Sequence, residues 1–61
     1  MEIGSMIAVE YNNGKLYSGV IVSVKKMHGY RTMFVLRVDN GYKSLYLDKC
    51  VTCDYIGFVN A

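Results

Sequence analysis

A chain of 61 residues with 52% hydrophobic residues, no proline and a net charge of +2 is expected to fold as one domain, residues 1–61, rather than stay disordered. A chain this short buries only about 60% of its unfolded surface, which leaves little room for a deep pocket. The mild charge permits contact with nucleic acid without indicating it. No basic, apolar leader is visible, and the run from residue 19 to residue 24 is too short to span a bilayer. We therefore expect a cytoplasmic protein with reduced cysteines.

The first two predicted strands cover residues 5–11 and 16–26, with a turn at Asn12-Asn13-Gly14-Lys15 between them. Alternation places one face of the first strand inward: Ile7, Val9 and Tyr11. In the second strand, alternation predicts three inward valines, Val20, Val22 and Val24. The opposite, outward face then carries Tyr17, Ile21, Ser23 and Lys25. Gly19 interrupts the second strand and predicts a bulge or a sharp bend, which a curled sheet requires.

After a loop at residues 27–30, the next predicted strands cover residues 31–39 and 42–47. Asn40-Gly41 between them predicts a two-residue type I′ turn, because both central positions of that turn need positive φ. The inward side chains of this hairpin are predicted to be Phe34, Leu36, Val38, Leu45 and Leu47. A 3₁₀ turn near residues 47–50, a fifth strand at residues 50–56 and a tail at residues 57–61 complete the chain. Five short strands with tight turns predict a partly open all-β barrel.

The order of these segments resembles the Tudor-like branch of the small SH3-like barrels. The residues that carry the resemblance are Ile7-Ala8-Val9-Glu10-Tyr11, Asn13-Gly14, Leu16-Tyr17-Ser18-Gly19-Val20-Ile21, Val35-Leu36-Arg37-Val38-Asp39-Asn40-Gly41 and Leu47-Asp48-Lys49-Cys50-Val51. The resemblance covers residues 5–56 and implies a five-stranded barrel with a 3₁₀ turn before the last strand. Related barrels bind methylated side chains, proline-rich peptides, nucleic acids or other subunits, so the function has to be argued from a site.

The main functional hypothesis is a non-catalytic binding module, and a small accessory or regulatory role would suit such a chain. Apolar and tyrosine side chains are predicted on the outer sheet face, where they would dock a protein partner or a second copy of the chain. The alternative is that a small sheet cannot hide all its apolar side chains, or that the tail covers them. The predicted protein-binding residues are Met6, Tyr17, Ile21, Met33, Val35, Tyr42 and Tyr46.

The second hypothesis is nucleic-acid binding through the loop between Lys25 and Arg31. Basic side chains there would contact phosphates while an aromatic ring stacks on a base. The alternative is a solvated hairpin tip whose lysines discourage edge-to-edge aggregation. The candidate residues are Lys25, Lys26, His28, Tyr30, Arg31, Arg37 and Lys43.

A third hypothesis, implied by the Tudor resemblance, is an aromatic cage that reads methylated peptides by cation–π attraction. Its candidate aromatics are Tyr11, Tyr17, Phe34 and Tyr42. The alternative is that these rings belong to the core or its rim, and alternation already points Phe34 inward.

Cys50-Val51-Thr52-Cys53 supplies two of the four ligands that structural zinc requires, and His28 is the one further ligand to consider within the chain. The alternative is a symmetric dimer that shares two such cysteine pairs. In a regular strand the two cysteines would point to opposite faces about 10 Å apart, too far for a disulfide. No Ser-His-Asp group, phosphate loop or carboxylate pair is present. We therefore expect no enzyme activity, no metal, no cofactor and no small-molecule substrate.

Overall fold

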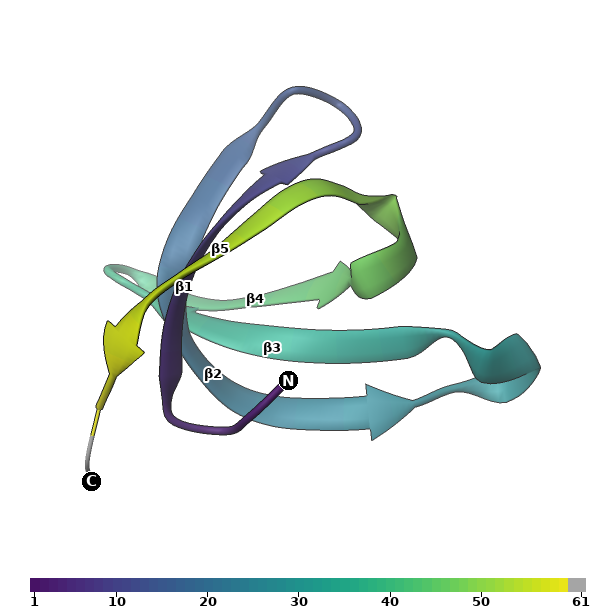
Figure 1. Cartoon of the computed structure of the whole chain (residues 1–61), viewed down its shortest axis with the longest axis horizontal. Helices are drawn as coiled ribbons and strands as arrows, with labels where there is room; N and C mark the ends of the chain where they lie inside the picture. Colours follow the sequence, from purple (N-terminus) through teal and green to yellow (C-terminus); the bar gives the residue numbers. More distant parts are fainter. Residues whose placement is uncertain (60–61) are drawn as a thin grey trace.

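The computed structural model describes residues 1–59, apart from the side chain of Tyr30, and is all-β. Its strands are β1 (Ser5–Tyr11), β2 (Leu16–Lys26), β3 (Thr32–Val38), β4 (Gly41–Tyr46) and β5 (Cys50–Phe58). They form one antiparallel sheet in the order β4-β3-β2-β1-β5. Two 3₁₀ turns join strands, η1 (His28–Tyr30) before β3 and η2 (Leu47–Lys49) before β5. The sheet is open, because β4 and β5 are its two edges (Figure 1).

The predicted strands are all present, and β1 and β2 have the predicted bounds. The predicted 3₁₀ turn before the last strand is confirmed as η2. The last strand is longer than predicted, because residues 57 and 58 extend β5 along β1 instead of starting a tail. The hairpin between β3 and β4 is also confirmed, but Val38 pairs with Gly41, so its two loop residues are Asp39 and Asn40. Gly41 follows the loop at φ 141°, a conformation that favours glycine.

The long strand β2 curves so that its first half lies beside β1 and its second half beside β3 (Figure 1). Gly19 lies where the two halves meet. A Cβ atom there would lie 2.2 Å from the carbonyl oxygen of Arg37, so only glycine allows the backbones to approach this closely. The close approach to β3 therefore explains why β2 has glycine at this position.

The predicted facing of β2 is wrong at its centre. Ile21 pairs with Leu36 and Ser23 with Val35, which leaves Val22 as an extra, bulged residue. The bulge changes the alternation along the strand, so Tyr17, Ile21 and Val24 share the face that packs on the core. Ile21 is fully buried, and it is therefore not the surface residue that strict alternation predicted.

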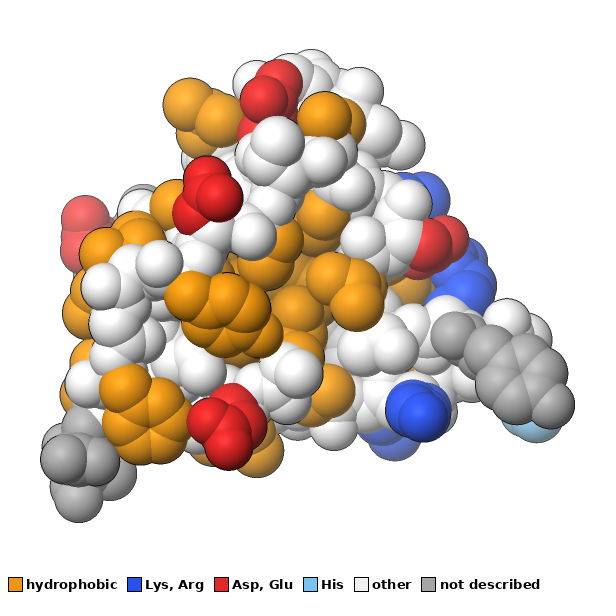
Figure 2. All heavy atoms as spheres, viewed as in Figure 1, with side chains coloured by type: hydrophobic (Ala, Val, Ile, Leu, Met, Phe, Trp, Pro, Cys, Tyr) orange, Lys and Arg blue, Asp and Glu red, His pale blue; other side chains and the backbone are white. Residues whose placement is uncertain are grey.

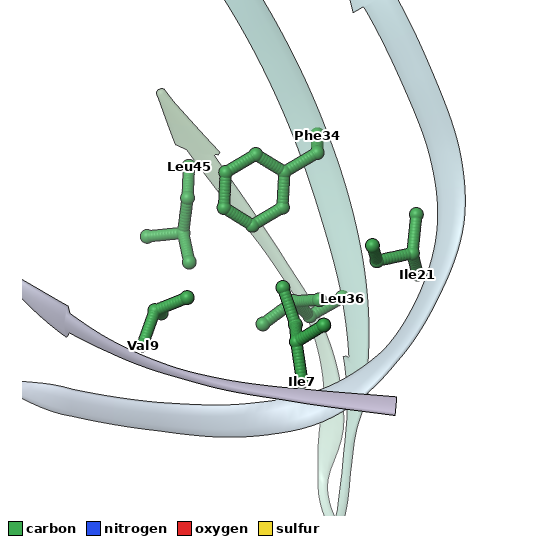
Figure 3. Packing of buried hydrophobic residues seen from close by; sticks show 6 residues of the cluster. All are labelled: Ile7, Val9, Ile21, Phe34, Leu36 and Leu45. Carbon is green, nitrogen blue, oxygen red and sulfur yellow. The ribbon is translucent and has the colours of Figure 1, made fainter. Parts of the chain in front are cut away.

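The core lies on the concave face of the curled sheet, where side chains from four strands meet (Figure 3). Its six buried apolar residues are Ile7, Val9, Ile21, Phe34, Leu36 and Leu45. The inward positions predicted for β1, β3 and β4 are confirmed for Ile7, Val9, Phe34, Leu36 and Leu45. Leu47, predicted to be inward, is exposed because it belongs to η2 and not to β4.

A few polar contacts hold the open side of the sheet together. The backbone N–H of Tyr46, at the end of β4, donates a hydrogen bond to the Tyr11 hydroxyl of β1 at 3.0 Å. The N–H of Asn12 donates to the carbonyl of Lys49 in η2 at 2.9 Å. These two bonds keep η2 against the end of β1, although β4 and β5 do not pair with each other.

Candidate protein-docking edge

The edge strand β5 has a free side for most of its length. Its other side pairs with β1, in a register that matches Ile7 with Tyr55, Val9 with Cys53 and Tyr11 with Cys50. Within residues 1–59 no strand pairs with its free side, which leaves a row of backbone groups available to another chain. Register shifts against β1 leave Val51 and Ile56 as bulged residues, so the regular part of the strand is residues 52–55.

Paired residues on adjacent strands point to the same face of a sheet, and this fixes the two faces of β5. Tyr55 lies opposite the buried Ile7, and Phe58 lies opposite the buried Ser5, so both rings are on the concave face. Thr52 and Asp54 lie opposite Glu10 and Ala8 on the convex face. Since β4 does not close over β5, the concave side chains at this edge are left uncovered.

Large apolar side chains gather on and beside this edge. Five of them are each between 57% and 63% exposed: Ile3, Val51, Tyr55, Ile56 and Phe58. Ile3 belongs to the set because its neighbour Gly4 approaches the Phe58 ring and accepts a hydrogen bond from the N–H of Val59 at 2.7 Å. Figure 2 shows hydrophobic side chains exposed along β5 and in the hollow beside it, in the same view as Figure 1. We call these five residues the β5 surface.

Cys50 and Cys53 lie on the same face of β5, contrary to the prediction that they point apart. The bulge at Val51 adds a residue between them, so they lie opposite Tyr11 and Val9 and both pack against the core. Burial raises the pKa of both thiols, and the negative charges of Cys53 and Asp48 raise the pKa of Cys50 further. Both cysteines are free thiols. Among the described residues no three His, Cys, Asp or Glu side chains are grouped to hold a metal ion.

The seven predicted protein-binding residues do not form one surface. Register places Met33 opposite Tyr46 and Arg37 opposite Tyr42 on the convex face, where Val35 and Met6 also lie. Met6, Met33, Val35 and Tyr46 are half-buried, whereas Tyr42 is exposed. Tyr17 is on the concave face instead, in edge-to-face contact with Tyr11 at 6.1 Å between ring centroids. The prediction is therefore wrong about the facing of Tyr17, as it is for the buried Ile21.

The predicted basic residues are spread over different parts of the molecule. Lys25, Lys26 and His28 are exposed around the end of the β2–β3 hairpin. The Arg31 guanidinium stacks on the Tyr46 ring, with its carbon 3.9 Å from the centroid, and its Nε lies 3.4 Å from a carboxylate oxygen of Asp48. Lys43 lies over the Tyr17 ring instead, at 5.4 Å, while Arg37 is exposed on the convex face. The side chain of Tyr30 is outside the described part of the chain.

The four predicted cage aromatics are not assembled around one space. Tyr11 and Tyr17 contact each other, whereas Phe34 is fully buried in the core. Tyr42 lies on the convex face of β4, opposite Arg37. An open, shallow pocket between the β1–β2 and β3–β4 hairpins is lined by Tyr17, Tyr42 and Lys43 among others, and Lys43 lies close to the Tyr17 ring there.

Sequence reasoning missed Tyr55, Ile56 and Phe58, which are central to the β5 surface. The signal was the apolar run from Tyr55 to Val59, interrupted only by Gly57. Tyr55 and Ile56 were predicted to lie in the fifth strand, but the sequence does not show that this strand is a sheet edge. Phe58 was predicted to lie in the tail at residues 57–61, so its exposure on the same edge was not considered.

Comparison of the chain with protein-family models, with curated proteins and with solved structures gave no match. Over residues 1–59, none of the helical segments has the length and apolar character needed to cross a membrane.

Proposed function

We propose that this chain is a Tudor-like, SH3-like open barrel that works as a non-catalytic binding module and docks a protein on the β5 surface. The fold proposal is supported by four consecutive antiparallel strands, a long second strand whose Gly19 lets β2 and β3 approach closely, and a 3₁₀ turn that returns the last strand to the side of β1. A small accessory or regulatory role suits such a module, and a cytoplasmic location stays our expectation.

The observation that carries the docking proposal is the composition of the free edge. β5 is nine residues long, and Asp54 is its one charged residue. Proteins usually protect such edges with lysines, prolines, short strand length or bulges, and of these devices β5 has only its bulges. The opposite edge, β4, follows this rule, because it has six residues and carries Lys43. A partner that covered β5 would bury apolar side chains and pair backbone groups in the same contact.

The β5 surface also differs from the convex face in how its apolar residues are arranged. On the convex face the half-buried Met33 and Val35 alternate with the exposed Arg37, and Arg31 and Lys49 cover the Tyr46 ring. On β5, four of the five members of the set lie within residues 51–58, with Ile3 beside them. An edge strand that carries four exposed apolar side chains and a single charge is a better docking surface than apolar residues that alternate with charges.

Site-specific photo-cross-linking tests this proposal. A photoreactive phenylalanine analogue replaces Phe58 in one variant and Tyr42 in a control, since Tyr42 is at least as accessible but lies on the other edge strand. Irradiation of cells that express each variant should give a protein adduct of defined mass at position 58 and none at position 42. The proposal is wrong if position 58 gives no protein adduct, or if both positions react to the same extent.

A further inference from the structure

We propose that the molecule docked on the β5 surface is a second copy of this chain. The two β5 strands would pair antiparallel around a two-fold axis at Cys53, which would join the two sheets into one. This inference rests on the proposed docking function and names its partner.

The free edges favour a closed pair over an open chain of molecules. A contact between β5 and the β4 edge of another copy would leave a β5 edge free at one end of the chain of molecules and a β4 edge free at the other. Such head-to-tail contacts form filaments unless they close into a ring. Lys43 and the short length of β4 also oppose that contact. Pairing β5 with β5 uses the same surface on both copies and leaves only the protected β4 edges free.

The size of the surface suits a second copy. Among the residues whose burial is described, ten large apolar residues are exposed, against six apolar residues in the core, so a large part of this apolar surface is uncovered in the isolated chain. The five side chains of the β5 surface expose roughly 100 Å² each, or about 500 Å² per copy. Two copies would bury at most about 1,000 Å² from these side chains, and the paired backbones add to this area, so the contact lies near the lower limit for a specific interface.

Charge and facing together select the register. Around a two-fold axis perpendicular to the sheet, one residue lies opposite its own counterpart, and the regular segment offers residues 52–55. An axis at Asp54 would place two carboxylates opposite each other, which is unfavourable. An axis at Thr52 would place the convex Asp54 opposite the concave Cys50 of the second copy. An axis at Tyr55 would place the convex Thr52 opposite the concave Phe58 of the second copy.

An axis at Cys53 avoids the pair of carboxylates and keeps convex residues opposite convex residues at positions 52 and 54, although it also places Cys50 opposite the bulged Ile56. Thr52 then lies opposite Asp54 of the second copy, and both belong to the convex face, so the hydroxyl can donate a hydrogen bond to the carboxylate. Tyr55 lies opposite the bulged Val51 of the second copy, which brings together two members of the β5 surface. The two Cys53 side chains face each other across the axis, with their Cβ atoms about 5 Å apart.

Thiol cross-linking of the purified protein tests both the partner and the register. Dibromobimane joins two nearby thiols when each sulfur displaces one bromide, and both thiol protons are released with the bromides. The Cys50→Ser variant keeps only Cys53, and the matched Cys53→Ser variant keeps only Cys50. We expect the cross-linked dimer to form at least 10-fold faster in Cys50→Ser than in Cys53→Ser. Equal rates, or faster cross-linking through Cys50, would overturn the register.

Sedimentation equilibrium tests the dimer itself. We expect the wild type to be dimeric at micromolar concentrations, and Tyr55→Glu to weaken the dimer at least 100-fold because it places a charge in the interface. Tyr42→Glu is the matched control and should remain dimeric, and circular dichroism should show that both variants are folded. A wild-type protein that stays monomeric would overturn the second-copy inference. Photo-cross-linking at position 58 to a different protein would then still support the docking function, whereas no adduct would remove both proposals.

Discussion

Gly19 is the residue on which the shape of the sheet depends most directly. Replacing it with alanine puts a methyl group 2.2 Å from the Arg37 carbonyl oxygen, so β2 and β3 must separate. We expect Gly19→Ala to lower the free energy of unfolding by about 1–3 kcal/mol or more, and urea denaturation measures this change. Gly57→Ala is the control, because a Cβ there meets nothing within 4 Å, and its effect should stay within about 0.5 kcal/mol. Equal effects at both positions would contradict this account.

Tyr11 stabilises the open side of the sheet through its hydroxyl. Tyr11→Phe removes the acceptor for the Tyr46 N–H, which is partly buried, and leaves that donor without its partner. We expect the free energy of unfolding to fall by about 1–3 kcal/mol. Tyr42→Phe removes the hydroxyl from an exposed ring and should have little effect. Amide hydrogen exchange at Tyr46 should become faster in Tyr11→Phe alone, and unchanged exchange would show that the bond contributes nothing.

The two thiols make the free energy of unfolding depend on pH in the alkaline range. Burial raises the pKa of Cys50 and of Cys53, so the folded chain holds these protons more tightly than the unfolded chain does. Their contribution is complete below the unfolded thiol pKa of about 8.5 and is lost as pH rises through the higher folded values. We expect the free energy of unfolding to fall more steeply above pH 8.5 in the wild type than in a Cys50→Ser, Cys53→Ser double variant. Parallel pH profiles would contradict the effect.

At the scale of single elements, the bulge in β2 decides which residues enter the core. Ile21 is fully buried, whereas Val20 on the preceding position is half-buried and lies opposite the exposed Arg37. We expect Ile21→Ala to lower the free energy of unfolding by about 2–5 kcal/mol. Val20→Ala should cost clearly less, and denaturant titrations compare the two variants. The reverse order would restore the facing predicted from strict alternation.

At the scale of the whole molecule, the small core makes stability depend on association. A dimer that forms only from folded chains stabilises them by mass action, so the melting temperature should rise with protein concentration. We expect this rise for the wild type and for Tyr42→Glu, and no rise for Tyr55→Glu, in calorimetric scans over a 100-fold concentration range. A melting temperature that is independent of concentration in all three would contradict the proposed dimer.

The sequence alone determined the five strands, the β3–β4 hairpin and the 3₁₀ turn, because alternation and turn residues act over short distances. It also identified most of the core, since Ile7, Val9, Phe34, Leu36 and Leu45 lie in regularly alternating segments. Only the tertiary structure decided the facing of Ile21 and of the two cysteines, because bulges at Val22 and Val51 change the alternation and depend on the neighbouring strand. The tertiary structure also decided the candidate site: Tyr55 and Phe58 are exposed because β5 is an edge of an open sheet, and strand order is set by contacts between distant segments.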